Sequence, residues 1–181
     1  RIGKMDILWT ENNRAQRGLD SVITYDTEEL KPYGPVLVAQ SDKGICFVGL
    51  PVEGSFETAI KAMLAYFPLA KFIETKSHSH RTGLDIQGTA MQIAVWKELL
   101  KIPEGETKTY KDIAEAINKP TAYRAVGNAV GANPVCIYIP CHRVVGSNGN
   151  LHGFAWGTLW KQKLLSDEAD KRPCNTKSVT A

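Results

Sequence analysis

Two short β-prone segments followed by the apolar pattern of an amphipathic helix are found in the first seventy residues. Residues 36–39 and 45–48 are apolar and largely β-branched, and turn-forming residues 41–44 separate them, which predicts a β-hairpin. Apolar residues then recur at helical spacing until Pro68 ends the pattern. The residues of this stripe are Phe56, Ala59, Ile60, Met63, Leu64 and Phe67. We expect an α/β unit in which this helix covers one face of a sheet.

A polar stretch without apolar period follows, over residues 74–83. This composition predicts a linker, so we place an N-terminal α/β domain, linker included, over residues 1–83. His78 and His80 lie in the linker, but no third ligand stands at a useful spacing. Exposed loop histidines are therefore favoured over a metal site.

Three helical patterns fill the next fifty residues. The first begins at Thr89 and stops at residues 103–105, with a predicted buried face of Met91, Val95, Trp96, Leu99 and Leu100. The second begins with a capping box formed by Thr109 and Asp112 and runs to about Ile117. The third presents Ala122, Ala125, Val126, Ala129 and Val130 at helical spacing.

Two short helices around a tight turn predict a helix-turn-helix. We expect a mainly α C-terminal domain over residues 84–170 and a flexible tail over 171–181. Alanine and glycine in the third helix bring its backbone close to a partner, which suits insertion into a DNA groove, where Arg124 can neutralise phosphate or enter the base stack. Close helix packing with a surface arginine is the alternative.

Charge is distributed unevenly along this ordinary globular composition of 181 residues, 43% hydrophobic and 23% charged. The net charge is only +3, but no acidic residue stands between Glu115 and Asp167. The basic residues of this stretch are Lys119, Arg124, Arg143, Lys161 and Lys163. They predict a positive face attractive to phosphates, with a merely solvated basic surface as the alternative.

No apolar stretch approaches the ~20 residues that cross a bilayer, so we expect a protein of the cytoplasm, or of the nucleus in a eukaryote, with no membrane partner. The four cysteines are Cys46, Cys136, Cys141 and Cys174. They form no C-x-x-C pair with matching histidines, which favours free thiols over a zinc site or a disulfide scaffold. We therefore expect no metal and no cofactor.

Cys141 follows an apolar, β-branched segment, residues 135–139, that predicts a buried strand ended by Pro140. Cationic neighbours stabilise the reactive thiolate, and His142 and Arg143 come directly after the cysteine. Neighbouring side chains of an extended chain point to opposite faces, so His142 needs a turn or a bridging water to reach the sulfur.

A carboxylate is expected to orient the imidazole of His142 from its other nitrogen, as in the generalised catalytic triad. The acid-free stretch leaves Asp167 and Glu168 as the candidates that are near in sequence. On these residues alone, an inert buried cysteine is the alternative to a nucleophile.

The chain between residues 84 and 168 resembles the O6-alkylguanine-DNA alkyltransferases, including the alkyltransferase half of bacterial adaptive-response proteins. The N-terminal region resembles the family only in general pattern; there the family has an RNase-H-like α/β domain, and its second domain carries a winged-helix-like helix-turn-helix. The motifs that carry the resemblance are Gly88 and Thr89, Val95 and Trp96, Ile102 and Pro103, Gly105 and Glu106, Thr109 and Tyr110, residues 124–126, Asn133 and Pro134, residues 139–145, and residues 153–157.

The resemblance implies that Cys141 is the alkyl acceptor and that His142, a bound water and Glu168 activate it. It also implies that Asn133 braces the turn beneath the site. Tyr110 would donate a hydrogen bond to a guanine ring nitrogen as charge develops on the leaving base. The implied reaction is irreversible transfer from O6-alkylguanine, with O4-alkylthymine as a second candidate substrate, once per molecule.

The resemblance further implies how a monomer binds double-stranded DNA. The recognition helix with Ala125 would enter the minor groove, and Arg124 would fill the space left by the flipped nucleotide. The implied pocket wall consists of Val144, Phe154, Ala155, Trp156 and Gly157. Two positions depart from the family: Phe154 replaces a usual tyrosine and loses its hydroxyl, and His152 replaces a residue that is often small, which affects pocket width.

Two other functions use the same residues. A Cys-His hydrolase would form and hydrolyse a thioester, but it needs an oxyanion hole and gives the helix-turn-helix no purpose. A DNA-binding module without chemistry, like the alkyltransferase-like proteins, would lack the acceptor cysteine. Because Cys141 is present, we favour the alkyl transferase.

Overall fold

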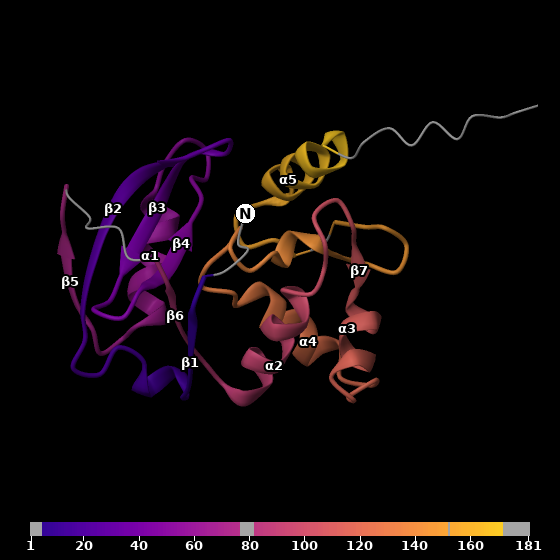
Figure 1. Ribbon diagram of the computed structural model, residues 1–181, viewed down its shortest axis with the longest axis horizontal. Helices are drawn as coiled ribbons and strands as arrows, with labels where there is room; N and C mark the ends of the chain where they lie inside the picture. Colours follow the sequence, from indigo (N-terminus) through magenta and orange to yellow (C-terminus); the bar gives the residue numbers. More distant parts are fainter. Residues whose placement is uncertain (1–4, 77–81, 152, 172–181) are drawn as a thin grey trace, which may run out of the picture.

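A sheet and a group of helices lie side by side in the computed structural model, which describes residues 5–76, 82–151 and 153–171 (Figure 1). The first half contains β1 (Ile7–Glu11), η1 (Arg14–Gln16), β2 (Val22–Leu30), β3 (Gly34–Gln40), β4 (Ile45–Gly49), α1 (Glu57–Tyr66), β5 (Lys71–Glu74) and β6 (Leu84–Gly88). The second contains α2 (Ala90–Leu99), β7 (Lys108–Thr109), α3 (Tyr110–Ala116), α4 (Tyr123–Gly131), η2 (Cys141–Arg143), β8 (Val144–Val145) and α5 (Thr158–Asp170).

The sheet has the strand order β1-β6-β4-β3-β2-β5. Strands β2, β3 and β4 form an antiparallel meander, while β5 pairs with β2, β6 with β4 and β1 with β6 in parallel. The predicted hairpin is confirmed as β3 and β4, in which Val38 pairs with Val48. The predicted helix is confirmed as α1, which packs against β4 and buries Ala59 and Met63.

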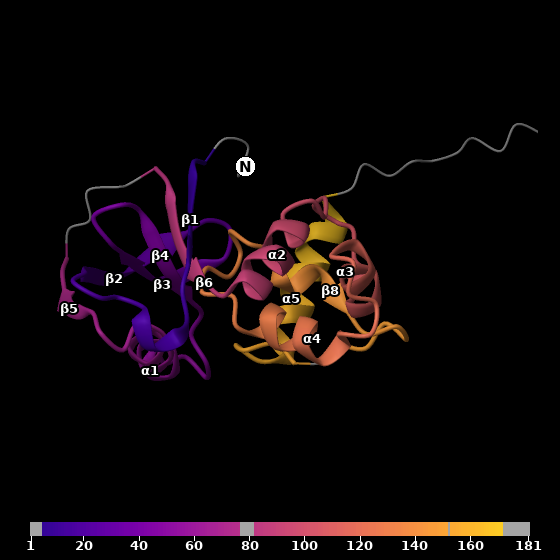
Figure 2. The same cartoon turned by 90° about the horizontal axis from the view of Figure 1, so that it is seen from below.

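The sheet extends beyond the domain boundary that the sequence predicts at residue 83. Strand β6 lies inside the sheet between β1 and β4, so the chain passes to the helical half after Gly88 (Figure 2). A Cβ added at Gly88 would lie 2.5 Å from the Trp96 ring, and only glycine lets the strand pass so close to α2. The sequence pattern assigned residues 84–88 to the C-terminal domain, because the pairing of this strand with β1 and β4 is non-local. His78 and His80 lie outside the described residues.

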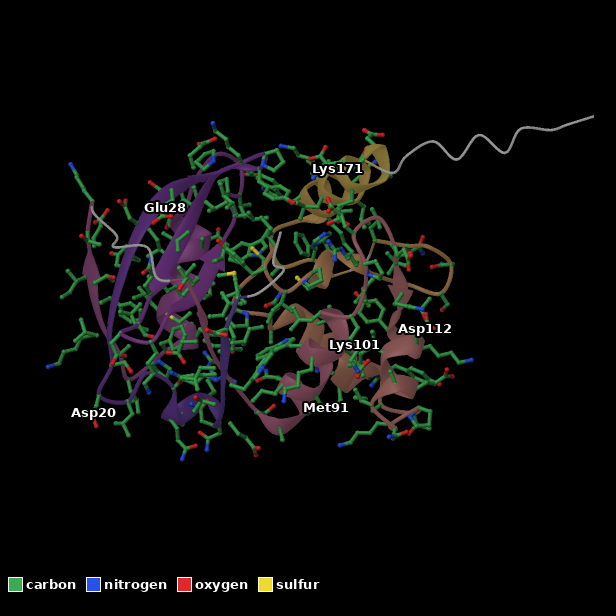
Figure 3. All side chains as sticks on the ribbon, viewed as in Figure 1. Asp20, Glu28, Met91, Lys101, Asp112 and Lys171 are labelled. Atoms are coloured by element: carbon green, nitrogen blue, oxygen red, sulfur yellow. The ribbon has the colours of Figure 1, made fainter. Side chains whose placement is uncertain are left out.

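The helical half is organised around α2. The indole N–H of Trp96 donates to the carbonyl of Ala129 in α4 at 2.8 Å, which ties the two helices together. The capping box predicted for α3 is confirmed: Asp112 N–H donates to Thr109 Oγ1 at 3.1 Å, and Thr109 N–H donates to Asp112 Oδ2 at 2.7 Å. Asp112 lies on the side of this half that faces away from the sheet (Figure 3). Helices α3 and α4 pack on α2 and on each other, as predicted for a helix-turn-helix.

The segment from residue 135 to 139 is a tight turn, and the strand predicted there is wrong. Val135 makes an isolated bridge to Val48, Cys136 bridges to Ile139, and Ile137 takes a positive φ of 74°. The β-branched residues are buried as expected, but a neighbouring side chain competes for the backbone groups. Asn133 accepts from Val135 N–H at 3.0 Å and donates to the Ile139 carbonyl at 2.7 Å.

The two halves share one apolar core and several hydrogen bonds. Val48 N–H donates to the Pro134 carbonyl at 2.8 Å, and the Cys136 thiol donates to the Val48 carbonyl at 3.2 Å. The Trp160 indole N–H donates to the Pro51 carbonyl at 2.7 Å. The end of β4 therefore supports the turn that leads to Cys141. Among the described residues, no helix is long and apolar enough to cross a membrane.

Candidate functional site

Cys141 begins η2, directly after Pro140, and its backbone N–H donates to the Ile139 carbonyl at 2.8 Å. The side chain lies at a pocket, and the residue is only 5% exposed. The residues that line this pocket are Val130, Gly131, Asn133, Cys141, Gly153, Phe154, Ala155, Trp156 and Lys161. Because η2 is a helical turn, Cys141 and His142 do not alternate across a strand as the sequence led us to expect.

A carboxylate hydrogen-bonds the histidine that follows the cysteine. His142 Nε2 lies 2.7 Å from Glu168 Oε1, and both side chains are almost fully buried, with 2% and 3% exposed. Helix α5 carries Glu168 to this position, on the same buried face as Leu164. The residue pattern left Asp167 and Glu168 open and the family resemblance implied Glu168; in the structure Glu168 is the partner of the imidazole.

Two further donors hold Glu168 in place. Arg143 Nη2 donates to Oε1 at 2.9 Å and Arg143 Nε to Oε2 at 3.0 Å, and Gly105 N–H donates to Oε2 at 3.2 Å. Burial raises the pKa of this carboxyl, but the hydrogen bonds from His142, Arg143 and Gly105 outweigh burial and bring the pKa to about 2. Glu168 is therefore a buried carboxylate at neutral pH.

The charge of Glu168 fixes the tautomer of a neutral His142. An ionised carboxylate only accepts hydrogen bonds, so Nε2 carries the proton and Nδ1 has the free lone pair. Nδ1 is buried and has no hydrogen-bond partner among the residues that the structure describes. The imidazole is thus oriented to accept a proton at Nδ1.

The thiol of Cys141 is protonated at rest. Burial raises its pKa, while the Asn133 amide, the cation of Lys161 and nearby backbone N–H groups oppose that effect only in part. A base is therefore needed to produce the thiolate.

Tyr110, the first residue of α3, is half-buried at a wider groove. Burial raises the pKa of its phenol, and the neighbouring Cys141 raises the pKa further, so the hydroxyl keeps its proton. The groove is lined by Tyr110, Gly127, Asn128, Gly131, Ala132 and Gly153. Gly131 and Gly153 also line the pocket, so the α4 surface leads directly to the cysteine.

Sequence comparisons identify the chain. A family model of the 6-O-methylguanine DNA methyltransferase DNA-binding domain matches residues 90–170. An inducible methylated-DNA–protein-cysteine methyltransferase from Bacillus subtilis is 42% identical over 151 residues, which cover 72% of this chain and 82% of that protein. The chain belongs to the methylated-DNA–protein-cysteine methyltransferase family.

Other members and solved structures of this methyltransferase family also match most of the chain. A Methanosarcina barkeri methyltransferase is 42% identical, with 80% of this chain and 96% of that protein covered. The regulatory protein ada of Salmonella typhimurium is 43% identical, and the match spans only 44% of that longer protein. A crystal structure of Mycobacterium tuberculosis OGT in complex with DNA has a TM-score of 0.59 at 34% identity, covering 84% of this chain and 96% of that one.

The exposed face of α4 differs from the predicted stripe. Val126, Ala129 and Val130 are buried as expected, but Ala125 is exposed together with Arg124. The buried stripe is narrower than the sequence indicates, because the main helix contacts of α4 are with α2 and α3. Arg124 and Ala125 are therefore accessible to a partner.

Several predicted site residues are placed differently. Phe154, Ala155 and Trp156 line the pocket, whereas Gly157 does not, and Val144 is fully buried in β8. His152, Cys174 and the predicted tail beyond residue 171 lie outside the described residues.

The predicted basic face is smaller than its residues suggest. Arg143 is bound to Glu168, and Lys161 is buried with 1% exposed, so Lys119, Arg124 and Lys163 remain on the surface. Sequence reasoning counted Lys161 as surface charge and missed it as a residue of the pocket. Its helical position was the available signal, because it lies seven residues before Glu168 and therefore on the same face of α5.

Proposed function

We propose that this chain repairs alkylated DNA by transferring an alkyl group from O6 of guanine to the sulfur of Cys141. The observation that carries this assignment is the buried Cys141, His142 and Glu168 arrangement, in which a carboxylate lies 2.7 Å from the imidazole next to the cysteine. Membership in the methylated-DNA–protein-cysteine methyltransferase family supports the same reaction. O4-alkylthymine is a second substrate of the proposal.

The first step is loss of the thiol proton. A bridging water takes the proton from Cys141 and passes one to Nδ1 of His142, the buried nitrogen with a free lone pair. Glu168 then stabilises the imidazolium through its hydrogen bond to Nε2. Asn133 braces the turn that leads to the cysteine, since its amide bonds both Val135 and Ile139.

The second step is a displacement at the sp³ carbon of the alkyl group. A sulfur–carbon bond forms, the carbon–oxygen bond breaks, and the electron pair moves to O6 of the leaving guanine. Tyr110, still protonated in its half-buried position, donates a hydrogen bond to a ring nitrogen and limits the developing charge. The product is a thioether, which has no carbonyl for water to attack, so each molecule reacts once.

Access requires the damaged base to leave the helix. Unstacking costs a few kcal/mol, which contacts in the pocket and an inserted side chain offset. The exposed Arg124 would occupy the gap in the duplex, and Ala125 lets the backbone of α4 approach the minor groove. Phe154, Ala155 and Trp156 would hold the flipped base against the pocket wall.

The finer architecture also belongs to this proposal. An RNase-H-like sheet domain is supported by the antiparallel β2-β3-β4 meander, with β5 added parallel to β2 after α1. A winged-helix-like acceptor domain is supported by the pairing of β7 and β8 beside the helix-turn-helix. We propose that the acceptor domain extends to residue 170 and that the protein acts as a monomer in the cytoplasm or nucleus.

Intact-mass measurement after incubation with methylated duplex DNA tests the proposal. The protein should gain the mass of one methyl group, and peptide mapping should locate it on Cys141. Cys141→Ala should gain none under the same conditions. A wild-type protein that stays unmodified, or that gains the methyl on Cys46 or Cys136, would refute the assignment.

A further inference from the structure

The surface of α4 carries a hydrogen-bonding side chain that the proposed reaction does not use, the amide of Asn128. Asn128 is exposed and lines the groove that leads to the pocket of Cys141. Within the part of the chain that the structure describes, its side chain makes no hydrogen bond. Two N–H donors and one carbonyl acceptor are therefore available to a partner in the groove.

Asn128 lies on the same face of α4 as Arg124, one helical turn further along. The buried residues of this helix lie on its other side: Val126, Ala129 and Val130. Residues four apart share one helical face, so Arg124 and Asn128 both point away from the core. Four residues span about 6 Å of helix, and neighbouring base pairs are about 3.4 Å apart. With Arg124 in the gap left by a flipped guanine, Asn128 stands roughly one or two base pairs away.

The groove beside Asn128 is open to the close approach of a ligand edge. Its other lining residues are Tyr110, Gly127, Gly131, Ala132 and Gly153. A Cβ added at Gly131 would meet no atom within 4 Å, so packing inside the protein does not require glycine there. Glycine destabilises a helix relative to alanine, but it lets a ligand come close to the backbone. The bare backbone at Gly131 therefore suits a base edge, with the amide of Asn128 projecting beside it.

The minor-groove edge of a base pair presents a simple pattern to such an amide. Every pair offers acceptors, N3 of the purine and O2 of the pyrimidine, and a G·C pair adds one donor, the N2 amino group of guanine. The amide of Asn128 donates from its nitrogen and accepts at its oxygen. It can therefore make two hydrogen bonds to a G·C pair, whereas an A·T pair satisfies only its donors.

We propose that Asn128 recognises a base pair close to the alkylated guanine through the minor groove and favours G·C over A·T at that position. The inference rests on the proposed function and adds a DNA-sequence preference to it. Arg124 does not supply this preference, because a guanidinium only donates and finds acceptors on every pair. Tyr110 is assigned to the flipped guanine. Among the described residues that line the groove, Asn128 is thus the one whose side chain distinguishes the two pairs.

The test uses inosine, which lacks the N2 amino group of guanine and keeps its major-groove edge. Duplexes carry O6-methylguanine and a G·C pair one or two steps away on either side, and each of these guanines is replaced by inosine in turn. The rate constant of methyl transfer is measured below saturation for the wild type, Asn128→Ala and Asn128→Leu, the last of which keeps a side chain of similar size. Gln162→Ala is the matched control, since Gln162 is an exposed amide on α5 outside the groove.

At one of these positions inosine should slow transfer by the wild type by about fivefold relative to the same replacement with Asn128→Ala, the factor that one neutral hydrogen bond provides. Inosine also weakens the duplex locally, but that effect is common to all variants and cancels in the comparison. Asn128→Leu should behave as Asn128→Ala, and Gln162→Ala should behave as the wild type. Transfer from the free base O6-methylguanine should be equal in the wild type and Asn128→Ala, which a folding defect would not allow.

Two results would overturn the role of Asn128. One is an equal effect of inosine on the wild type and on Asn128→Ala at every position tested. The other is a loss of transfer in Asn128→Ala that is the same for guanine and inosine duplexes, because Asn128 would then make a general contact with DNA. A wild type that accepts no methyl group from any duplex would instead overturn the proposed function itself.

Discussion

Glu168→Gln is the substitution with the best-defined energetic consequence, because it removes a buried charge and keeps the shape of the side chain. The hydrogen bonds from His142, Arg143 and Gly105 lower the pKa of Glu168 from 4.5 to about 2 in the folded protein. A pKa difference of about 2.5 corresponds to about 3 kcal/mol of folding free energy, at about 1.4 kcal/mol for each unit. Because the side chain is only 3% exposed, solvent screens this contribution little.

The sign follows from the depressed pKa. The folded state binds the Glu168 proton less tightly than the unfolded state, so the stabilisation is complete above about pH 4.5 and disappears as the pH falls towards about 2. The wild type should therefore exceed Glu168→Gln in stability by about 3 kcal/mol at neutral pH, and the difference should shrink through this acidic window.

Urea unfolding at a series of pH values, extrapolated to water, measures both curves. Glu115→Gln serves as the control, since the Glu115 carboxylate forms an exposed ion pair with Lys111 at 3.7 Å and its loss should change stability by less than about 1 kcal/mol. The reasoning would be refuted by a wild-type advantage over Glu168→Gln that stays constant from neutral pH to about pH 2. In the same variant the relay is broken, so transfer should slow and the thiol of Cys141 should titrate at higher pH.

Three further predictions concern the site. Cys141→Ala should abolish transfer but bind duplex DNA as tightly as the wild type in a gel-shift titration; weaker binding would show that the sulfur has a role in DNA contact. Arg124→Ala should slow transfer from duplex DNA by about tenfold or more and transfer from a free alkylated base far less, since the residue acts in base extrusion at a cost of a few kcal/mol; equal losses on both substrates would contradict that role. A chelator should leave single-turnover transfer unchanged, because the proposed chemistry requires no metal; a loss that added metal restores would contradict it.

The features that the sequence predicted well depend on neighbours in the chain. The β3-β4 hairpin, helix α1 and the capping box at Thr109 follow from local turns, apolar period and side-chain caps, and the structure contains each. The β-branched composition of residues 135–139 gave a wrong strand prediction, because a side chain rather than a neighbouring strand bonds the backbone there. The apolar turn before Cys141 looked like a strand from its β-branched residues, although the family resemblance implied a turn braced by Asn133, whose side chain bonds Val135 and Ile139.

The features that the sequence could not supply join distant segments. Strand β6 belongs to the sheet through its pairing with β1, in which Leu84 lies opposite Ile7, nearly eighty residues earlier in the chain. The residue pattern alone left Asp167 and Glu168 open, and only the family resemblance favoured Glu168, because the choice depends on the rotation of α5 against η2. The same rotation buries Lys161, which the run of basic residues in the acid-free stretch had assigned to the surface.

The number of alkyl groups that each molecule accepts tests the central claim most directly. Methylated duplex DNA in excess is incubated with a known amount of active protein, and repaired guanine is counted over time. A thioether at Cys141 offers water no carbonyl, unlike the thioester of a hydrolase, so the acceptor should not regenerate. The account predicts that repair stops when one methyl group has been removed for each active molecule, and repair that continues beyond that point would contradict it.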